Sequence, residues 1–176
     1  MGQTVEQQGD LARARKDFDE ALSIQEQLGE KGSAADTRRA LAEWDYNSGD
    51  PASAESLART VIAQYRQLKA EDGALRAAAV LIHSLVAQGK LADARQVVAE
   101  AAPASGGDLD VVTTLSWALA RARVLAAGTD RAAAEALARQ ALADARSAGL
   151  VRYQLEASLA LAGDASARAA VGADAR

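Results

Sequence analysis

Apolar side chains recur along this chain with the period of an α-helix. In the first clear segment, Ala14, Phe18, Ala21 and Leu22 stand at i, i+4, i+7 and i+8, which places them on one helix face. Charged residues fill most positions between them, as in "RARKDFDE". The segment therefore predicts an amphipathic helix that buries one stripe and exposes the opposite face to solvent.

The same stripe returns at intervals of about forty residues. Glycines that end an apolar-periodic stretch recur together with the small or apolar residues behind them. The recurring positions are Gly9, Gly49, Gly89 and Gly128; Ala14, Ala54, Ala94 and Ala134; Phe18, Ala58, Val98 and Ala138; Ala21, Val61, Ala101 and Ala141; and Leu22, Ile62, Ala102 and Leu142. Four matched stripes indicate a repeated supersecondary unit.

Each of these glycines predicts the end of one helix and the start of another. Glycine readily takes the left-handed conformation that closes a helix. Asp10 and Asp50 are suitable N-caps, and Pro51 stands where a first-turn proline is tolerated. So short a turn makes the two helices antiparallel, and the alanine behind it lets their backbones approach closely. The unit is therefore predicted to be a helix hairpin.

The pattern predicts an all-α chain of four hairpins, the first of them incomplete. We expect helices at about 11–28, 34–48, 51–70, 74–88, 91–102, 108–127, 131–148 and 151–162. Pro103 is expected to end one helix early, and the next helix is expected to start early in compensation. We expect a repeat domain over 1–162 and a weakly ordered tail over 163–176, because that tail has one large apolar residue, Val171.

These residues resemble the tetratricopeptide repeat. The turn "GDLARA", the following Phe18 and the "AL" at 21–22 are similar to the signature of the family's second helix, and the "LA" at 41–42 is similar to that of its first helix. The forty-residue period resembles the longer-helix variants of kinesin light chains. The stretch "ALSIQEQLGEKGSAADTRRALA" resembles the repeats attached to bacterial eukaryotic-like serine/threonine kinases and regulators. The resemblance implies a right-handed superhelix of antiparallel hairpins.

The chain also departs from that family. Asp45 and Leu85 stand where the family favours tyrosine, and Arg121 falls near a position that prefers a small residue. Gly128 stands one residue before the position that the forty-residue step from Gly89 predicts. The register of its hairpin is therefore uncertain by one residue. The HEAT repeat has a similar period and is the alternative fold, although the glycine turn followed by a fixed alanine favours the tetratricopeptide type.

The resemblance also implies a binding surface. In tetratricopeptide arrays the first helix of each hairpin lines a concave groove that binds peptides or partner helices. Transferred by position, the candidate binding residues are Asp36, Arg39, Glu43, Tyr46, Asn47, Arg76 and His83. Their mixed charge suits a peptide with both signs, and they lack the dense basic cluster that captures a terminal carboxylate. The alternative is that these side chains are simply exposed to solvent.

Composition narrows the function classes. The net charge is −4 with both signs interspersed, which disfavours a nucleic-acid or anionic-membrane surface. The chain has no cysteine, no secretory signal at its start and no apolar run of about twenty residues. We therefore expect a cytoplasmic protein with neither a disulfide framework nor a membrane span.

Catalytic and metal-binding chemistry finds little support in the chain. His83 is the only histidine and has no cysteine or paired carboxylate near it in sequence, so no metal site is expected. None of the glycine-containing turns has the spacing of a phosphate-binding loop. We expect no enzyme activity, no cofactor and no catalytic residue.

Three functions remain in competition. The first is a protein- or peptide-binding scaffold within a larger bacterial signalling or regulatory protein, and the second is a ligand-sensing domain that controls an attached kinase-type domain. An enzyme is the least favoured. Both ends of the array retain apolar residues such as Phe18 and Leu159, so we also expect self-association through the terminal hairpins and a segment that belongs to a longer protein.

Overall fold

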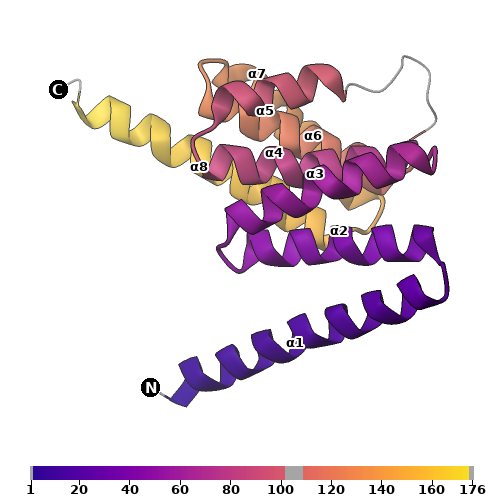
Figure 1. Ribbon diagram of the computed structural model, residues 1–176. Helices are drawn as coiled ribbons and strands as arrows, with labels where there is room; N and C mark the ends of the chain where they lie inside the picture. The colour runs from indigo at the N-terminus through magenta and orange to yellow at the C-terminus, as the bar shows by residue number, and fades with distance from the viewer. Residues whose placement is uncertain (1, 102–108, 175–176) are drawn as a thin grey trace.

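The computed structural model describes residues 2–101 and 109–174, with the side chains of 13–101 and 109–163. Over these residues the chain forms eight α-helices and no strand, which confirms the all-α fold class (Figure 1). The helices are α1 (Gly2–Gln27), α2 (Lys31–Asn47), α3 (Pro51–Gln67), α4 (Glu71–Ala87), α5 (Leu91–Glu100), α6 (Val111–Ala127), α7 (Arg131–Ser147) and α8 (Val151–Asp174).

The structural unit is a single helix followed by a three-residue turn. Helices α2, α3, α4, α6 and α7 each have 17 residues, and three residues separate successive helices everywhere except between α5 and α6. Gly29, Gly49, Gly89 and Gly149 take positive φ angles of 70° to 89° at the middle of their turns, and Lys69 takes the same role with φ 55°. Apart from the Gly128 turn and the longer connection between α5 and α6, the turns within and between hairpins are therefore of one kind.

Two predicted helix starts are wrong for this reason. Helix α2 begins at Lys31 rather than 34, and α4 begins at Glu71 rather than 74. Gly32 and Gly73, which suggested longer breaks, lie inside these helices. A positive φ at the preceding turn residue reverses the chain within three residues, so no longer connection is needed.

The predicted turn at Gly9 is also wrong, because α1 continues from Gly2 to Gln27 through both Gly9 and Asp10. A glycine inside a helix costs only about 1 kcal/mol. The helix therefore continues through Gly9 without a break. The first hairpin therefore does not form, and α1 is a single helix at the end of the stack.

The other predicted boundaries have mixed outcomes. Asp50 accepts a hydrogen bond from Ser53 N at 3.0 Å with Pro51 in the first turn, as predicted. Helix α5 ends at Glu100, before Pro103, as predicted. The expected early start of α6 at 108 is wrong, because α6 begins at Val111 after the N-cap Asp110.

The turn at Gly128 closes α6 in a different way. Gly128 has φ −93° and ψ −144° and so does not take the predicted left-handed conformation. The turn still joins α6 to α7 in three residues, so the early glycine changes the path of the backbone without shifting the repeat. At the other end of the chain, α8 extends to Asp174, through the segment expected to be a weak helix or frayed.

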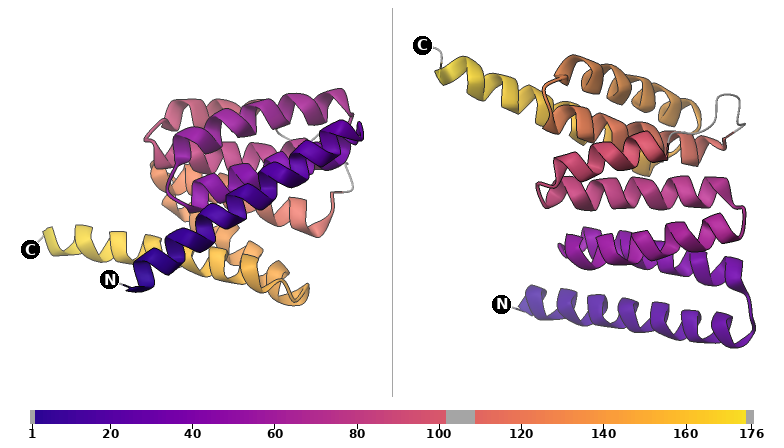
Figure 2. Two further views of the ribbon diagram at one scale, coloured as in Figure 1. Left: turned by 60° about the horizontal axis from the view of Figure 1, so that its bottom comes forward. Right: turned by 45° about the horizontal axis from the view of Figure 1, so that its top comes forward.

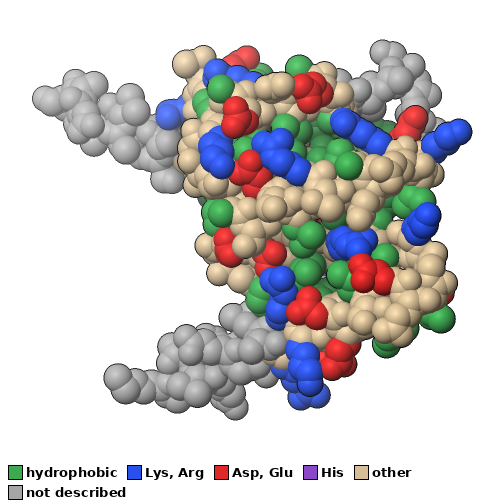
Figure 3. All heavy atoms as spheres, in the orientation of Figure 1, with side chains coloured by type: hydrophobic (Ala, Val, Ile, Leu, Met, Phe, Trp, Pro, Cys, Tyr) green, Lys and Arg blue, Asp and Glu red, His purple; other side chains and the backbone are tan. Residues whose placement is uncertain are grey.

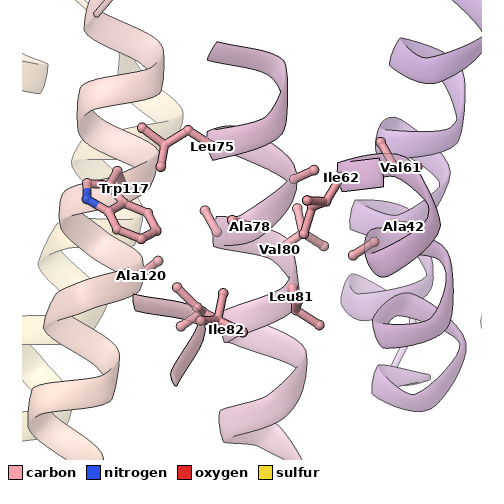
Figure 4. Close-up of a cluster of buried hydrophobic side chains, with 14 of the residues drawn as sticks. Ala42, Val61, Ile62, Leu75, Ala78, Val80, Leu81, Ile82, Trp117 and Ala120 are labelled. Carbon is pink, nitrogen blue, oxygen red and sulfur yellow. The ribbon is translucent and has the colours of Figure 1, made fainter. Parts of the chain in front are cut away.

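Helix α4 lies at the centre of the core. Ten of its residues are buried, and it sends Leu75 toward Trp117 on α6 and Leu81 toward the side of α3 (Figure 4). The alanines behind the turns are also buried: Ala54 and Ala94 are fully inaccessible. Small side chains at these positions allow the close helix–helix packing that the sequence predicted.

The helices stack in chain order. The hairpins α2/α3, α4/α5 and α6/α7 lie side by side, with α1 against α2 at one end and α8 against α6 and α7 at the other (Figure 2). The even-numbered helices are consecutive neighbours, α2 with α4, α4 with α6, and α6 with α8. Basic and acidic side chains are interspersed over the face seen in Figure 3. The right-handed sense of the superhelix stays a prediction.

Candidate functional site

The four even-numbered helices converge on one cavity of about 530 Å³, which we call the central cavity. Each of α2, α4, α6 and α8 contributes to its wall. The lining residues are Glu43, Tyr46, Asn47, Arg76, Ala79, Val80, His83, Ser116, Arg123, Arg152, Tyr153, Leu155, Glu156 and Leu159. The predicted binding surface on the first helices of the hairpins is therefore part of a larger, half-open cavity.

Five of the seven predicted binding residues lie together in this cavity. They are Glu43, Tyr46, Asn47, Arg76 and His83. They come from two helices, α2 and α4, so the transfer by position brought correct neighbours together. Their role in binding stays a prediction.

The other two predicted residues do not line the cavity. Asp36 accepts a hydrogen bond from the Tyr65 hydroxyl at 2.6 Å and borders a neighbouring hollow. Arg39 donates to Glu43 Oε1 at 2.6 Å, and its side chain is largely buried. Both are therefore engaged within the fold: Asp36 by α3, and Arg39 as support for Glu43.

Sequence reasoning missed the residues on α6 and α8, although the repeat held a signal for most of them. Ser116 and Glu156 follow Arg76 at steps of forty residues, and Arg123 follows His83 by forty. The same step that relates the hairpins therefore predicts these cavity positions. Arg152, near the start of α8, has no such signal, because its place depends on how the whole stack curves.

An ion pair connects the first and last helices that line the cavity. Arg152 Nη2 on α8 lies 3.0 Å from Glu43 Oε2 on α2, although the two residues are 109 positions apart in sequence. The Arg152 guanidinium also lies 5.7 Å from the centre of the Tyr153 ring. The stack therefore curves enough for α8 to reach α2 across the intervening helices.

Two tyrosines and the histidine form a polar and aromatic wall. Arg123 donates a hydrogen bond to the Tyr46 hydroxyl and lies 5.7 Å from the centre of that ring. The Tyr46 and His83 rings are 5.7 Å apart at a tilt of 50°. Tyr153 shares a hydrogen bond of 3.0 Å with Ser116. Flat rings with neighbouring cations provide surfaces on which a peptide group or an apolar side chain can pack.

Burial keeps His83 neutral. Its side chain is 14% exposed, and burial, with the nearby positive charges of Arg123 and Arg152, lowers the pKa of His83 to about 3. Glu156 Oε1 lies 3.8 Å from His83 Nε2, and burial raises the pKa of Glu156 against the opposing effect of the two arginines. Desolvation therefore favours the neutral form of both groups, and the arginines dominate the charge of the cavity.

Some polar groups of the cavity have no partner among the described residues. Arg76 Nε and His83 Nε2 are buried there without a hydrogen-bond partner. Neither Arg76 nor Arg123 lies within 4.0 Å of a carboxylate oxygen in the described part of the chain. Buried polar groups are normally satisfied, so these atoms are available to a bound molecule.

A second hollow lies on another side of the molecule. Helix α5 has 10 residues where neighbouring helices have 17, and a cleft of about 600 Å³ lies beside it against α3 and α4. Its floor includes the apolar side chains of Ile62, Leu75 and Val97. Among the described residues this cleft has no buried polar atom without a hydrogen-bond partner. We therefore regard the central cavity as the candidate site.

No group of three or more histidine, aspartate or glutamate side chains is placed to hold a metal ion within the described chain. No described helix is both long enough and apolar enough to cross a membrane.

Part of the chain matches a known protein family. Residues 1–67 match the family model of the tetratricopeptide repeat. The match supports the predicted resemblance over α1, α2 and α3 and agrees with the helical-repeat fold. No match was found among curated proteins or among solved structures.

The matched family bears on function in general terms. Tetratricopeptide repeats generally mediate protein–protein interactions, and the family is typically a non-catalytic scaffold. Helices α4, α6 and α7 lie outside the matched residues but keep the 17-residue length and the three-residue turns of α2 and α3. The repeat geometry is therefore continuous from the matched part into the central cavity.

Proposed function

We propose that this chain is a protein-interaction scaffold that binds a short peptide segment of a partner protein in the central cavity. The observation that carries the proposal is the convergence of four repeat helices on one half-open cavity whose walls hold unpartnered polar groups. A volume of about 530 Å³ is typical of a cavity that takes a compact ligand rather than a long extended chain. We therefore expect one or two anchoring side chains to enter the cavity.

The charges of the cavity favour an acidic anchor. Arg39 and Arg152 already neutralise Glu43, whereas neither Arg76 nor Arg123 forms an ion pair with a carboxylate of the described chain. An aspartate or glutamate side chain of the peptide would accept charge-assisted hydrogen bonds from these arginines. Ala79 and Val80 line the same space and would contact an apolar neighbour of the acidic residue.

The test begins with peptide selection from a displayed library against the wild-type chain. Fluorescence anisotropy then gives the affinity of the selected peptides for the wild type, Arg76→Ala and Arg123→Ala. Loss of a hydrogen bond to a charged group is worth about 1.5–3 kcal/mol, so we expect each variant to bind roughly 10- to 150-fold more weakly.

Arg131→Ala is the matched control, because Arg131 is an exposed arginine at the start of α7 and lies outside the cavity. It should bind as the wild type does. Selected peptides that lack acidic residues, or that bind Arg76→Ala and the control equally well, would contradict the proposal.

A second candidate function is a ligand-sensing domain that controls an attached catalytic domain, such as a kinase. The closure of the cavity by Arg152 and Glu43 supports this alternative, because a bound ligand that competes for Arg152 would alter the position of α8. A thermal-shift screen with small anionic metabolites distinguishes the two candidates. Stabilisation by a metabolite that is lost in Arg76→Ala favours sensing over peptide binding.

The cellular setting is part of the same proposal. The resemblance to repeats of bacterial kinases and regulators supports a role in bacterial signalling within a larger protein. The net charge of −4 with interspersed signs supports a cytoplasmic protein that binds neither nucleic acid nor membranes. Self-association is also proposed, because Leu155 and Leu159 on the last helix are 62% and 71% exposed.

A further inference from the structure

The last helix presents two leucines whose repeat counterparts are buried. Leu155 and Leu159 on α8 are 62% and 71% exposed, and they lie on one face because they are four residues apart. We call this pair the C-terminal face. Forty residues earlier on α6, Leu115 and Leu119 are 1% and 3% exposed. The C-terminal face is therefore uncovered at a position that the repeat otherwise buries.

The repeat also shows what covers these positions. Leu115 and Leu119 belong to a buried cluster with Ala157 of the next even helix, α8. Eighty residues before the C-terminal face, Leu75 on α4 packs in a cluster with Trp117 of the next even helix, α6 (Figure 4). In both cases the cluster also includes residues of the following odd helix, Ala141 and Ala145 of α7 or Ala94 and Val97 of α5, so the next two helices of the array provide the cover. No further helix follows α8 among the described residues.

The opposite end of the stack lacks the complementary neighbour. Helices α3, α5 and α7 each contact the even helix before them and the even helix after them, whereas α1 contacts α2 alone among the described helices. Ile24 on α1 is 57% exposed. Forty residues later, Gln64 on α3 faces the preceding helix, where it accepts a hydrogen bond from Arg38 at 3.2 Å. By register, Ile24 faces the position that the preceding even helix takes beside α3, and no described helix occupies that position.

Helix α2 is also less buried than its counterpart, α4. Ala40 and Trp44 are only partly buried, whereas their counterparts Val80 and Ser84 on α4 are 7% and 0% exposed. We define the N-terminal face as Ile24, Ala40 and Trp44. In the repeat, a preceding even helix would cover these residues.

We propose that a second copy of the chain docks its N-terminal face on the C-terminal face of the first, so that α1 and α2 of one copy follow α8 of the other as the next helices of the array. The contact reproduces the internal interfaces between α4 and α6 and between α6 and α8. It is heterologous, since the two surfaces differ, and each bound copy leaves a free face for another. The assembly therefore grows with concentration and does not stop at a twofold dimer.

The test uses one variant of each face. Leu159→Asp blocks the C-terminal face and Ile24→Asp blocks the N-terminal face, and both side chains are exposed in the single chain, so the fold tolerates them. Circular dichroism verifies that the helix content of each variant matches that of the wild type. Val151→Asp is the matched control, because Val151 is 64% exposed but its counterpart Val111 stays 45% exposed even where a further even helix follows.

Light scattering from micromolar to near-millimolar concentration gives the mass. We expect the wild type and Val151→Asp to grow beyond a dimer, and each face variant alone to keep the mass of one chain, 18.2 kDa. An equal mixture of Leu159→Asp and Ile24→Asp should form a single dimer and nothing larger, because one intact face of each kind remains.

Three results would overturn the proposal. A wild type that keeps the mass of one chain throughout excludes the docking. A wild type that stops at a dimer, together with an Ile24→Asp variant that dimerises equally well, indicates pairing of α8 with α8. A mixture of the two face variants that stays at the mass of one chain shows that the two faces do not meet.

Discussion

Gly32 and Gly73 lie inside the first turns of α2 and α4, and the structure predicts opposite effects for replacing them by alanine. An alanine Cβ at Gly32 would meet no atom within 4 Å. At Gly73 the same atom would lie 2.5 Å from Cδ1 and Cε1 of Tyr65 and 2.9 Å from its Cζ. Both substitutions give the helix a better helix former, but only Gly73→Ala makes a neighbouring ring move.

The magnitudes follow from the surroundings of that ring. Alanine in place of a helical glycine stabilises the fold by roughly 0.5–1 kcal/mol, which is the whole effect expected for Gly32→Ala. Tyr65 is 3% exposed, and its hydroxyl donates to Asp36 at 2.6 Å. Displacing the ring adds an overpacking cost of about 1–3 kcal/mol and weakens a hydrogen bond worth about 1 kcal/mol. Gly73→Ala should therefore destabilise the fold by about 1–3 kcal/mol.

Guanidinium unfolding followed by circular dichroism measures both variants. The midpoint should rise for Gly32→Ala and fall for Gly73→Ala. In a Tyr65→Leu background the clash is removed, so Gly73→Ala should become neutral or stabilising. If Gly73→Ala stabilises the wild type as much as Gly32→Ala does, the Tyr65 ring moves without cost and the reasoning from close approach is wrong.

Three further predictions concern packing, titration and turns. Ala54→Leu should lower the free energy of unfolding by about 1–3 kcal/mol through overpacking, and so lower the unfolding midpoint. Ala52 is exposed, so Ala52→Leu should leave the midpoint unchanged; equal midpoints for the two variants would show that the assigned repeat register is wrong. The single imidazole of His83, followed by NMR, should stay neutral from pH 7.5 to pH 4, because its pKa in the fold is about 3; titration near pH 6.5 would contradict this. Since unfolded histidine binds a proton below about pH 6.5, stability should fall as the pH drops from 6.5 toward 3, and His83→Gln should reduce that fall. Lys69→Gly should stabilise the fold by up to about 1 kcal/mol, because Lys69 has φ 55°, and Gly49→Ala should destabilise it by a similar amount; thermal melts that show the reverse signs would refute the turn assignment.

The sequence predicted the turns well where a hairpin surrounds them. Gly49 and Gly89 take positive φ as expected, because a helix lies on each side to pack against. Gly9 stands in nearly the same local sequence but lies inside α1, because a continuous helix tolerates a glycine at a cost of only about 1 kcal/mol. Gly73 looked like a break for a related reason: its role depends on the Tyr65 ring, which no local pattern reveals.

The candidate site was predictable only in part. The forty-residue step and the family resemblance identified residues on α2 and α4, and the same step extends to Arg123 on α6. Asp36 and Arg39 share the helix of the cavity residues, but neighbouring side chains engage them. Arg152 reaches α2 because small rotations between successive helices accumulate over the stack, and sequence periodicity does not encode the sum of those rotations.

The closing contact between Arg152 and Glu43 has a consequence for the order in which the chain folds. Every pair of helices whose backbones are in contact is one or two elements apart along the chain, so most of the native contacts are local in sequence. Local contacts require little loop closure and favour rapid folding from any hairpin outward. The Arg152–Glu43 pair spans 109 residues and forms only when the intervening helices have already stacked. The central cavity is therefore the last part of the molecule to be completed, and it exists only in the fully assembled array.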